Sequence, residues 1–402
     1  MIKVLMVITG GLRRNGICVS QLDYAKKISK TDFQVDFAAV HNDSKEMIEK
    51  YKECGCIVYK LPDRRKNLFK YIKALKKLLN SEKYDIIHVH GSSALMFIEL
   101  LIAKKCKVKV RIAHSRNTKC DRPLIDKILR PIFYSSFNYA LACGTDAGKW
   151  LFNKKKFNVF FNGKDLEQYK FKGDLRKEYR EKLHLKNDEI AFGNVGTFYE
   201  QKNHLFLIDV YNKIYENNKK SKLFLMGEGI LENKIREKVS KYGLENNVIF
   251  LGRVSNVNDF LNAMDCMLFP SLFEGLPNVV LEWQINGLTS IISNTITDEC
   301  IVTDFVKSIP INQGTKTWTD FVKKIKIDTL KERINKSKTG CEKIIKAGFE
   351  INNNTLKLEE YYKECLKKEG INWDDNEKNL EILNRYWNAK IYTGWKVFKN
   401  EI

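Results

Sequence analysis

The chain has 402 residues, of which 44% are hydrophobic and 30% are charged, and this composition excludes a disordered or collagen-like protein. The length exceeds what one hydrophobic core usually serves and therefore favours two domains. No apolar run reaches the ~18–20 residues that cross a bilayer, and residues 1–8 lack the basic region and cleavage site of a signal peptide. We therefore expect a folded cytoplasmic protein that begins with a buried strand.

The net charge of +21 is concentrated in the first half of the chain. Residues 1–165 contain 33 Lys+Arg and 15 Asp+Glu, a balance of +18, which leaves 37 and 34, or +3, for residues 166–402. A basic half favours an anionic partner, which would be a substrate, a membrane surface or a nucleic acid. The nucleic-acid hypothesis lacks support, because the sequence contains no helix-turn-helix, zinc or aromatic-stacking motif.

Short apolar runs alternate with amphipathic stretches through the first half, which is typical of βαβ units. The runs predict strands at residues 4–8, 35–40, 57–61, 86–90, 108–113, 139–143 and 159–161. Residues 63–80 predict an amphipathic helix in which seven Lys and Arg residues interleave with an apolar stripe. Packing of the stripe on the sheet explains the helix itself. The surplus charge around it leads us to expect a peripheral contact with the anionic inner face of the cell membrane.

The same rhythm restarts in the second half and predicts a second doubly wound sheet. Strands are expected at 190–195, 223–226, 248–251, 267–269 and 290–292, with helices that include 205–215 and 231–242. The polar stretch 162–188 is the predicted hinge, and after about residue 326 the pattern becomes helical. We predict an α/β protein with Rossmann-like domains at 1–170 and 171–350 and a C-terminal segment of helices and a Trp-rich tail at 351–402.

Cysteine and histidine usage argues against a metal centre. The ten cysteines are scattered, and the closest pair, Cys54 and Cys56, is spaced too tightly for the usual zinc pattern. Only His88 and His90 form a close pair of histidines, and their alternation on a buried strand favours a structural role. We therefore expect no metal and no other cofactor.

The segment 269–283 is the most informative part of the sequence. A strand ends in the turn Phe-Glu-Gly-Leu-Pro, and a helix follows, with Pro277 suited to its first position. This arrangement places Glu274 in a loop and Glu282 on a helix at the carboxyl end of the sheet, where such folds bind ligands. Amides of the turn and the helix start would hold an anion, while the carboxylates would accept hydroxyl hydrogens, a combination that suits a sugar nucleotide.

This segment resembles the Glu–seven residues–Glu motif of the retaining, GT-B-fold glycosyltransferases of the glycogen synthase-like family four. Further similarity lies at 85–91, 195–204, 250–253 and 263–265, and is closest to members that build bacterial capsular polysaccharides and exopolysaccharides. The resemblance spans roughly residues 1–370. It implies two Rossmann-like domains that face each other across a cleft, with the acceptor bound on the N-terminal side and the nucleotide sugar on the C-terminal side.

The resemblance also assigns roles to residues. Glu282 would bind the ribose hydroxyls and Glu274 the hydroxyls of the donor sugar, while Lys202 matches the lysine that binds the diphosphate. An ammonium beside the leaving diphosphate stabilises charge that grows in the transition state and would replace a metal. The amides around Gly275, Leu276 and Asn278 would support the sugar and the phosphate.

One family residue is absent. Thr197 stands where many members have an arginine, so we expect Arg253 or a basic residue of the first domain to compensate.

In the first domain, Asn15 and Gly16 lie in a glycine-containing loop after the opening strand, and only Gly16 matches the family pattern closely. A simple tight turn is the alternative there.

His114 follows the predicted strand 108–113 and matches the family's histidine beside the donor sugar. We expect it to position the sugar, and a structural histidine is the alternative.

The predicted function is transfer of a sugar from a nucleoside diphosphate sugar to a saccharide or lipid-linked acceptor. We expect the donor to be a UDP-sugar. An inactive nucleotide-sugar-binding module and a sugar-nucleotide epimerase are the alternatives.

Overall fold

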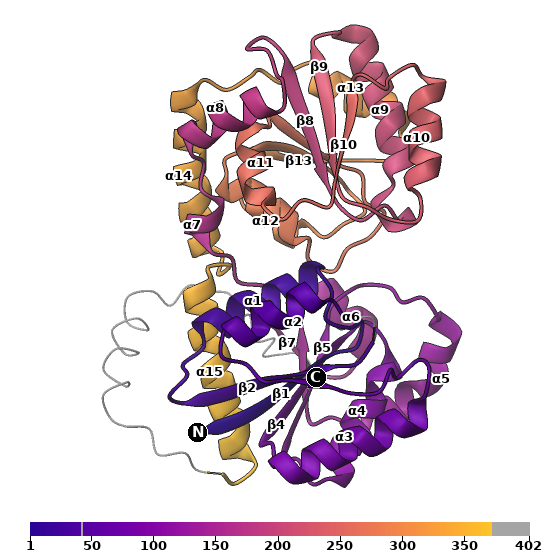
Figure 1. The fold of residues 1–402 in the computed structure, drawn as a ribbon, viewed down its shortest axis with the longest axis vertical. Helices are drawn as coiled ribbons and strands as arrows, with labels where there is room; N and C mark the ends of the chain where they lie inside the picture. The colour runs from indigo at the N-terminus through magenta and orange to yellow at the C-terminus, as the bar shows by residue number, and fades with distance from the viewer. Residues whose placement is uncertain (42, 372–402) are drawn as a thin grey trace. The chain divides into compact units, whose positions relative to one another are not determined.

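The computed structural model describes residues 1–41 and 43–371, which form two compact units (Figure 1). Among the described residues, the first unit contains 1–41, 43–116, 120–163 and 345–371. The second unit contains residues 117–119 and 164–344. The first unit is therefore assembled from segments that lie on both sides of the second in the sequence.

A parallel seven-stranded sheet forms the centre of the first unit, with strand order β3-β2-β1-β4-β5-β6-β7. The strands are β1 (Ile2–Ile8), β2 (Phe33–Ala39), β3 (Val58–Lys60), β4 (Ile86–Gly91), β5 (Val110–Ser115), β6 (Tyr139–Ala142) and β7 (Asn158–Val159). The order reverses where β1 lies beside β4. Sheets of this kind bind ligands outside the carboxyl ends of the strands at such a reversal.

Helices cover both faces of this sheet (Figure 1). One face carries α1 (Gly16–Lys27), α2 (Lys45–Glu53) and the C-terminal α15 (Ile351–Lys368). The other carries α3 (Leu68–Glu82), α4 (Phe97–Lys105), α5 (Pro123–Tyr134) and α6 (Thr145–Phe152). In α3 the apolar stripe is buried at Tyr71, Leu75 and Leu78 while the lysines are exposed, which confirms the predicted packing of the basic helix.

The second unit is built on a parallel six-stranded sheet of order β10-β9-β8-β11-β12-β13. Its strands are β8 (Ile190–Val195), β9 (Ser221–Met226), β10 (Val248–Gly252), β11 (Cys266–Phe269), β12 (Thr289–Ser293) and β13 (Val306–Ile309). Its helices are α7 (Leu166–Tyr169), α8 (Gly173–Lys182), α9 (His204–Asn217), α10 (Glu232–Lys241), α11 (Val257–Ala263), α12 (Asn278–Ile285), α13 (Gly314–Val322) and α14 (Leu330–Lys346). Residues of α9, α10 and α13 share one hydrophobic core with the sheet.

The organisation differs from the sequence-based expectation in three places. The stretch 162–188, expected as a hinge, contains α7 and α8. Strand β13 was not predicted, because its two central residues are exposed and it lacks a continuous apolar run. Helix α15, expected in a separate segment 351–402, belongs to the first unit, where Leu358 and Leu366 pack with β1 and β2. The Trp-rich tail lies outside the described residues.

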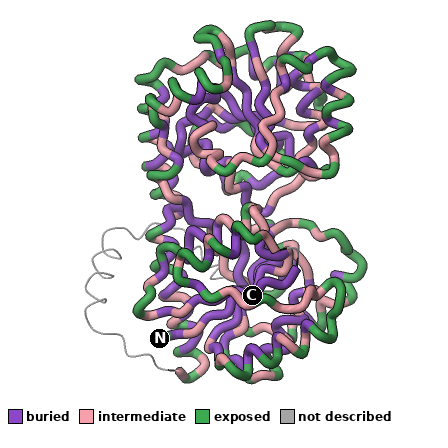
Figure 2. The backbone as a smooth tube through the Cα atoms, in the orientation of Figure 1, coloured by how far each residue is buried: buried purple, intermediate pink, exposed green. Residues whose placement is uncertain are grey.

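Burial follows the layers within each unit. The strands are buried and the outer surfaces of the helices are exposed (Figure 2). This is the pattern of parallel sheets that are covered on both faces. Among the helices described between residues 1 and 371, we find none whose length and apolar content would let it span a membrane.

Candidate active site

An ion pair forms at the carboxyl end of the second sheet. Glu274 lies in the loop between β11 and α12, and its Oε1 accepts a hydrogen bond of 2.6 Å from Nζ of Lys202. Their side chains are only 10% and 17% exposed, so the pair is largely shielded but reachable from solvent. The structure thus brings together two predicted site residues that lie 72 positions apart.

Local backbone geometry holds this pair in place. Gly196 follows β8, and a Cβ on it would lie 3.2–3.4 Å from side-chain carbons of Lys202, so the lysine stem passes over a position without a side chain. The short helix η2 (Glu200–Lys202) is tied to the loop, because the amide of Leu272 donates to the carbonyl of Gln201 and the Gln201 side chain donates to the carbonyl of Phe273, both at 2.8 Å.

The second predicted glutamate also pairs with a lysine. Glu282, on α12, accepts a 2.6 Å hydrogen bond from Nζ of Lys164, whose side chain is fully buried. A buried carboxylate of this kind needs a counter-charge, since an unpaired charge in the interior is strongly unfavourable. Lys164 was not among the predicted site residues, because it lies 118 positions from its partner and no local pattern links the two.

The remaining predicted residues of the second unit are placed as follows. Gly275 and Leu276 are buried, Asn278 is half-buried at the start of α12, and Pro277 is the N-cap instead of the first helical residue. Arg253 is 43% exposed and pairs with Glu228 at 3.3 Å. The structure does not bring Arg253 into contact with the carboxylate–lysine pairs.

In the first unit, the glycine-containing loop leads into α1. The side chain of Asn15 accepts hydrogen bonds from the amides of Ile17 and Cys18, both at 3.0 Å, so it is the N-cap of this helix. Gly16 is exposed at the first helical position. The capping contact gives the Asn15 side chain a structural role at the start of α1. The start of the helix is exposed to solvent at Gly16.

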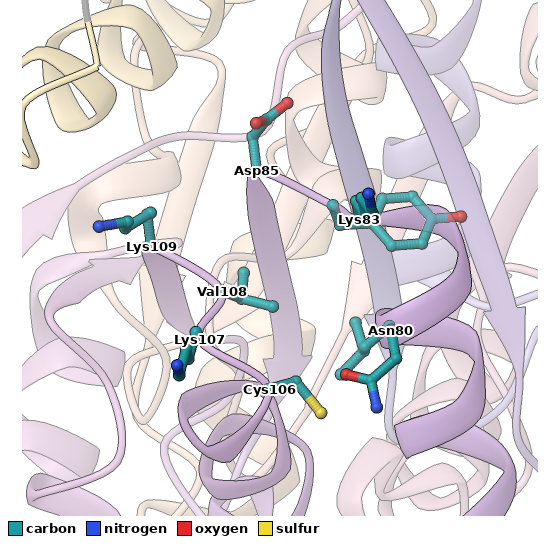
Figure 3. Close-up of a pocket in the computed structure, with 9 residues that line it drawn as sticks. Asn80, Lys83, Asp85, Cys106, Lys107, Val108 and Lys109 are labelled. Carbon is teal, nitrogen blue, oxygen red and sulfur yellow. The ribbon is translucent and has the colours of Figure 1, made fainter.

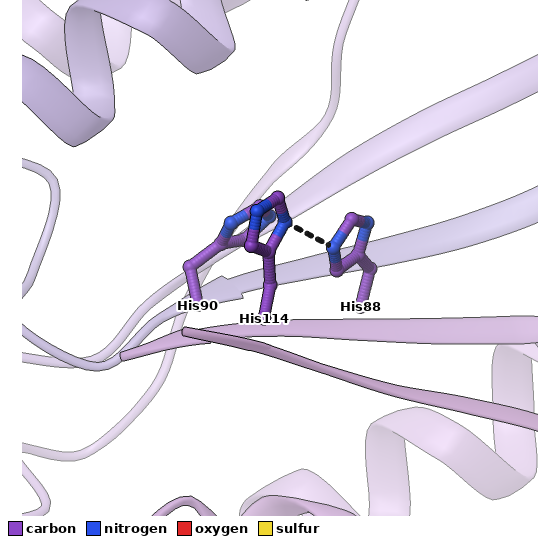
Figure 4. A group of neighbouring side chains, drawn as sticks. All are labelled: His88, His90 and His114. Carbon is purple, nitrogen blue, oxygen red and sulfur yellow. Dashed lines mark hydrogen bonds between the residues drawn. The ribbon is translucent and has the colours of Figure 1, made fainter. Parts of the chain in front are cut away.

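His114 lies within a cluster of three buried histidines, the histidine triad of His88, His90 and His114 (Figure 4). His88 and His90 project from β4, and His114 is the register partner of His90 on β5. His88 Nε2 lies 3.0 Å from His114 Nδ1, and the rings of His88 and His90 stack at 4.2 Å. The sequence placed His88 and His90 on one strand but gave no signal that His114 joins them.

The hydrogen bonds of the triad fix its tautomers. Arg116 has only donors, so the 3.2 Å contact of its Nη1 requires His114 Nε2 to accept. His114 then donates from Nδ1 to His88 Nε2, and His88 donates from Nδ1 to the hydroxyl of Tyr362 at 2.7 Å. The result is a directed chain of hydrogen bonds from Arg116 to the C-terminal helix α15.

Burial keeps these histidines neutral. Desolvation lowers the pKa of His88 to about 3, with a further contribution from the positive charge of Arg116. Desolvation also lowers the pKa of His114 and of His90 well below 6.5. His114 is therefore suited to positioning through hydrogen bonds and unsuited to taking up a proton near neutral pH.

The triad nitrogens lie within 4.8 Å of one another, a spacing that allows three ligands to share a metal ion. A cation bound at His114 Nδ1 would move the ring proton to Nε2, opposite an N–H of Arg116. It would also add positive charge beside a buried guanidinium. The donor set therefore fits a metal ion poorly and fits the hydrogen-bond chain well.

A pocket in the first unit lies at the amino ends of the strands, opposite the end that carries His114 (Figure 3). It has a volume of about 260 Å³ at the amino ends of β4 and β5 and is lined by Leu79, Asn80, Lys83, Tyr84, Asp85, Cys106, Lys107, Val108 and Lys109. None of the predicted site residues lines it. This pocket is therefore separate from the predicted site residues.

Both units match known protein families. Residues 14–168 match the family described as Glycosyltransferase Family 4, and residues 176–346 match Glycosyl transferases group 1. The chain belongs to these glycosyltransferases. The predicted family and the predicted enzyme class are confirmed.

Similar glycosyltransferases span nearly the whole chain. The capsular polysaccharide biosynthesis glycosyltransferase CapH of Staphylococcus aureus is 26% identical over 380 residues, which cover 90% of this chain and 99% of CapH. The UDP-Gal:alpha-D-GlcNAc-diphosphoundecaprenol alpha-1,3-galactosyltransferase of Escherichia coli is 29% identical over 310 residues, 73% of this chain and 79% of that enzyme.

The fold comparison gives the same architecture. The crystal structure of HepE from Anabaena in complex with UDP-glucose has a TM-score of 0.75 at 14% identity and covers 90% of this chain and 99% of HepE. The two parallel sheets, of seven and six strands, are those expected of the GT-B fold. The predicted fold class of this glycosyltransferase is confirmed.

Proposed function

We propose that this glycosyltransferase transfers a sugar, with retention of configuration, from a UDP-sugar to a saccharide or lipid-linked acceptor in the synthesis of a capsular polysaccharide or exopolysaccharide. The single observation that supports the donor assignment is the pairing of both motif glutamates with lysines, Glu274 with Lys202 and Glu282 with Lys164. The similar proteins support the classes of donor and acceptor, because one is named for UDP-Gal and a diphosphoundecaprenol-linked sugar and another for capsular polysaccharide biosynthesis.

In this proposal the glutamates bind hydroxyl groups. Glu282 accepts hydrogen bonds from the ribose, since Lys164 holds its carboxylate in one orientation through a buried contact. Glu274 accepts hydrogen bonds from the donor sugar. A carboxylate that is fixed before the ligand arrives loses little conformational entropy on binding, which favours affinity.

Lys202 has a different role. Its ammonium group has three N–H donors, of which one is used by Glu274, so it can bind a diphosphate oxygen while the ion pair persists. Bond cleavage between the sugar and the diphosphate increases negative charge on the leaving group, and a fixed cation stabilises that charge. We further propose that Lys202 makes a metal ion unnecessary, so UDP binding and turnover should persist in EDTA and should not rise when Mg²⁺ or Mn²⁺ is added.

Nucleotide binding tests the donor assignment before any acceptor is known. Thermal-shift titrations with UDP, GDP, ADP and CMP should show stabilisation by UDP, which reaches about 2.7 kcal/mol at 100 times its dissociation constant. Glu282→Gln should weaken UDP binding about tenfold or more, because it replaces a charged acceptor of hydroxyl hydrogen bonds. Glu237→Gln, an exposed change on α10, is the matched control and should leave the UDP shift unchanged. Stabilisation by none of the four nucleotides would contradict the proposal.

Turnover separates an enzyme from a binding module. Slow hydrolysis of the UDP-sugar without acceptor, lost in Lys202→Met, is expected of the proposed transferase. UDP binding without hydrolysis or transfer to any added saccharide or lipid-linked saccharide would favour an inactive module. Release of an epimerised nucleotide sugar would favour the epimerase.

We also propose that the first unit contacts an anionic membrane surface. Phe69 on α3 is 86% exposed, and Leu124 and Ile128 on α5 are 78% and 76% exposed, in the half of the chain that carries a charge of +18. Exposed apolar side chains together with surface lysines are typical of interfacial helices. Flotation should therefore be stronger with anionic than with neutral liposomes and should weaken in Leu124→Ser/Ile128→Ser. Equal flotation with both liposome types would contradict the membrane proposal.

A further inference from the structure

Arg116 is a buried arginine at the edge of the first sheet where ligands are expected. It directly follows β5, its amide donates to the carbonyl of Gly91 at 2.9 Å, and the residue is only 7% exposed. This position is the carboxyl end of the strands, close to the reversal of strand order between β1 and β4.

Its guanidinium contacts no carboxylate among residues 1–41 and 43–371. Nη2 donates to Oδ1 of Asn162 at 2.7 Å and Nη1 donates to Nε2 of His114 at 3.2 Å, and both of these acceptors are neutral. The Nε atom is buried and has no hydrogen-bond partner in this described part of the chain. Desolvation lowers the pKa of the Arg116 guanidinium, and the titratable side chains that come next as influences, Cys143 and Tyr24, are a thiol and a phenol, which are uncharged at neutral pH.

A second polar side chain beside it is also unsatisfied. His90 lies opposite His114 in the sheet and is fully buried, and neither of its ring nitrogens has a hydrogen-bond partner among the residues that the structure describes. Its carbonyl accepts from the amide of Thr9, so it lies at the reversal of strand order itself. A buried polar group without a partner needs an explanation, and a bound ligand is one that suits two such groups at the carboxyl ends of neighbouring strands.

The chemistry of the missing partner follows from Arg116. A buried guanidinium with a full charge and no counter-ion is costly, and a protein retains such a group where an anion neutralises it in the working state. Its planar set of N–H donors matches the oxygens of a phosphate group. His90 can add a hydrogen bond to a hydroxyl or phosphate oxygen of the same ligand.

We propose that Arg116 binds a phosphate oxygen of a diphosphate-bearing substrate. Its guanidinium is then the positively charged group with which the first unit binds this anion. This inference rests on the proposed function and goes beyond it, because neither the sequence motif nor the family match assigns a role to Arg116. The diphosphate has two possible sources with the same chemistry, a nucleoside diphosphate donor or a lipid diphosphate acceptor.

Binding measurements with two pairs of probes distinguish the sources. UDP is compared with uridine, and farnesyl diphosphate with farnesol, by titration calorimetry on the full chain. The variant Arg116→Gln removes the charge and keeps an N–H donor. Arg111→Gln is the matched control, because Arg111 lies near the amino end of β5 and its guanidinium donates to the backbone carbonyls of Ser136, Val108 and Lys109.

The expected result is a loss of about tenfold or more in affinity for at least one diphosphate in Arg116→Gln, with uridine and farnesol binding unchanged. Loss with UDP identifies the donor as the source, and loss with farnesyl diphosphate identifies the acceptor. Unchanged affinity for both diphosphates would overturn the inference. If Glu282→Gln still lost UDP binding in that case, the proposed function would stand while the role of Arg116 fell.

A measurement on the unaltered protein covers the possibility that Arg116→Gln does not fold. The Nε–H resonance of Arg116, identified by its absence from Arg116→Lys, should shift when the probe diphosphate is added, because Nε has no partner in the free protein. A resonance that stays in place at saturating concentrations of both diphosphates would refute the proposal. The Arg111 resonance should not move in either case.

Discussion

Acid should destabilise the first unit through the histidine triad before carboxylates begin to titrate. In the unfolded chain each histidine has a pKa near 6.5, whereas in the fold burial lowers the pKa of His88 to about 3 and that of the other two well below 6.5. The unfolded chain therefore binds more protons. The contribution of the neutral histidines to the free energy of unfolding is fully present above about pH 6.5. It is lost as the pH falls toward the folded-state pKa values.

The magnitude follows from proton linkage. A histidine that must stay neutral in the fold costs about 1.4 kcal/mol per pH unit below its unfolded pKa, and about 2 kcal/mol between pH 7 and pH 5. His88, whose pKa falls to about 3, therefore contributes about 2 kcal/mol over this range, and the lowered pKa values of His90 and His114 change the stability in the same direction. The hydrogen-bond chain from Arg116 to Tyr362 also requires His114 and His88 to be neutral, because it assigns one ring proton to each of them.

Hydrogen exchange of the β4 and β5 amides, followed by mass spectrometry at pH 7, 6 and 5, measures the free energy of unfolding of this unit alone. His90→Gln should reduce the pH slope, since it removes one buried histidine whose ring makes no hydrogen bond to the described residues. Ile112→Val, a buried change on the neighbouring strand, should lower stability by about 0.5–1.5 kcal/mol at every pH and leave the slope unchanged. A stability that does not change between pH 7 and pH 5, or an unaltered slope in His90→Gln, would refute the reasoning.

Three further substitutions have defined outcomes. Lys164→Met should destabilise the second unit by about 3–5 kcal/mol in urea unfolding, because Glu282 remains buried without its partner, and Lys164→Met/Glu282→Leu should recover most of that loss. Gly196→Ala should weaken UDP binding with little loss of melting temperature, because the new methyl group would displace the stem of Lys202. Tyr362→Phe should cost about 1–3 kcal/mol and shift the imidazole ¹⁵N resonances of the triad, because one ring N–H loses its acceptor; unchanged resonances would contradict the assigned tautomers.

Most of the fold could be predicted because most strands contain a short, largely apolar run between polar segments. Strand β13 and helices α7 and α8 escaped prediction, since the first lacks such a run and the other two lie in a stretch that is polar overall. The affiliation of α15 depends on contacts across more than 270 positions, such as Tyr362 with His88, which no local pattern reveals.

The candidate site was predictable where it rests on a contiguous motif. Glu274 and Glu282 are found eight positions apart, and they lie, as predicted, in the loop after β11 and on helix α12. Lys202 comes from the short helix η2 and Lys164 from the segment between β7 and α7, so the pairs become visible only in three dimensions. Arg116 and Tyr362 carried no signal at all, because their significance depends on what surrounds them.

The discontinuous composition of the first unit has a consequence for protein synthesis. The core that contains β1, α1 and α2 is completed by Leu358, Tyr362 and Leu366 of α15, which leave the ribosome after the entire second unit. The second unit can therefore fold while the first still exposes part of its apolar surface. During translation that surface is a binding site for chaperones, and any message truncated after residue 344 yields a chain whose N-terminal half lacks its closing helix.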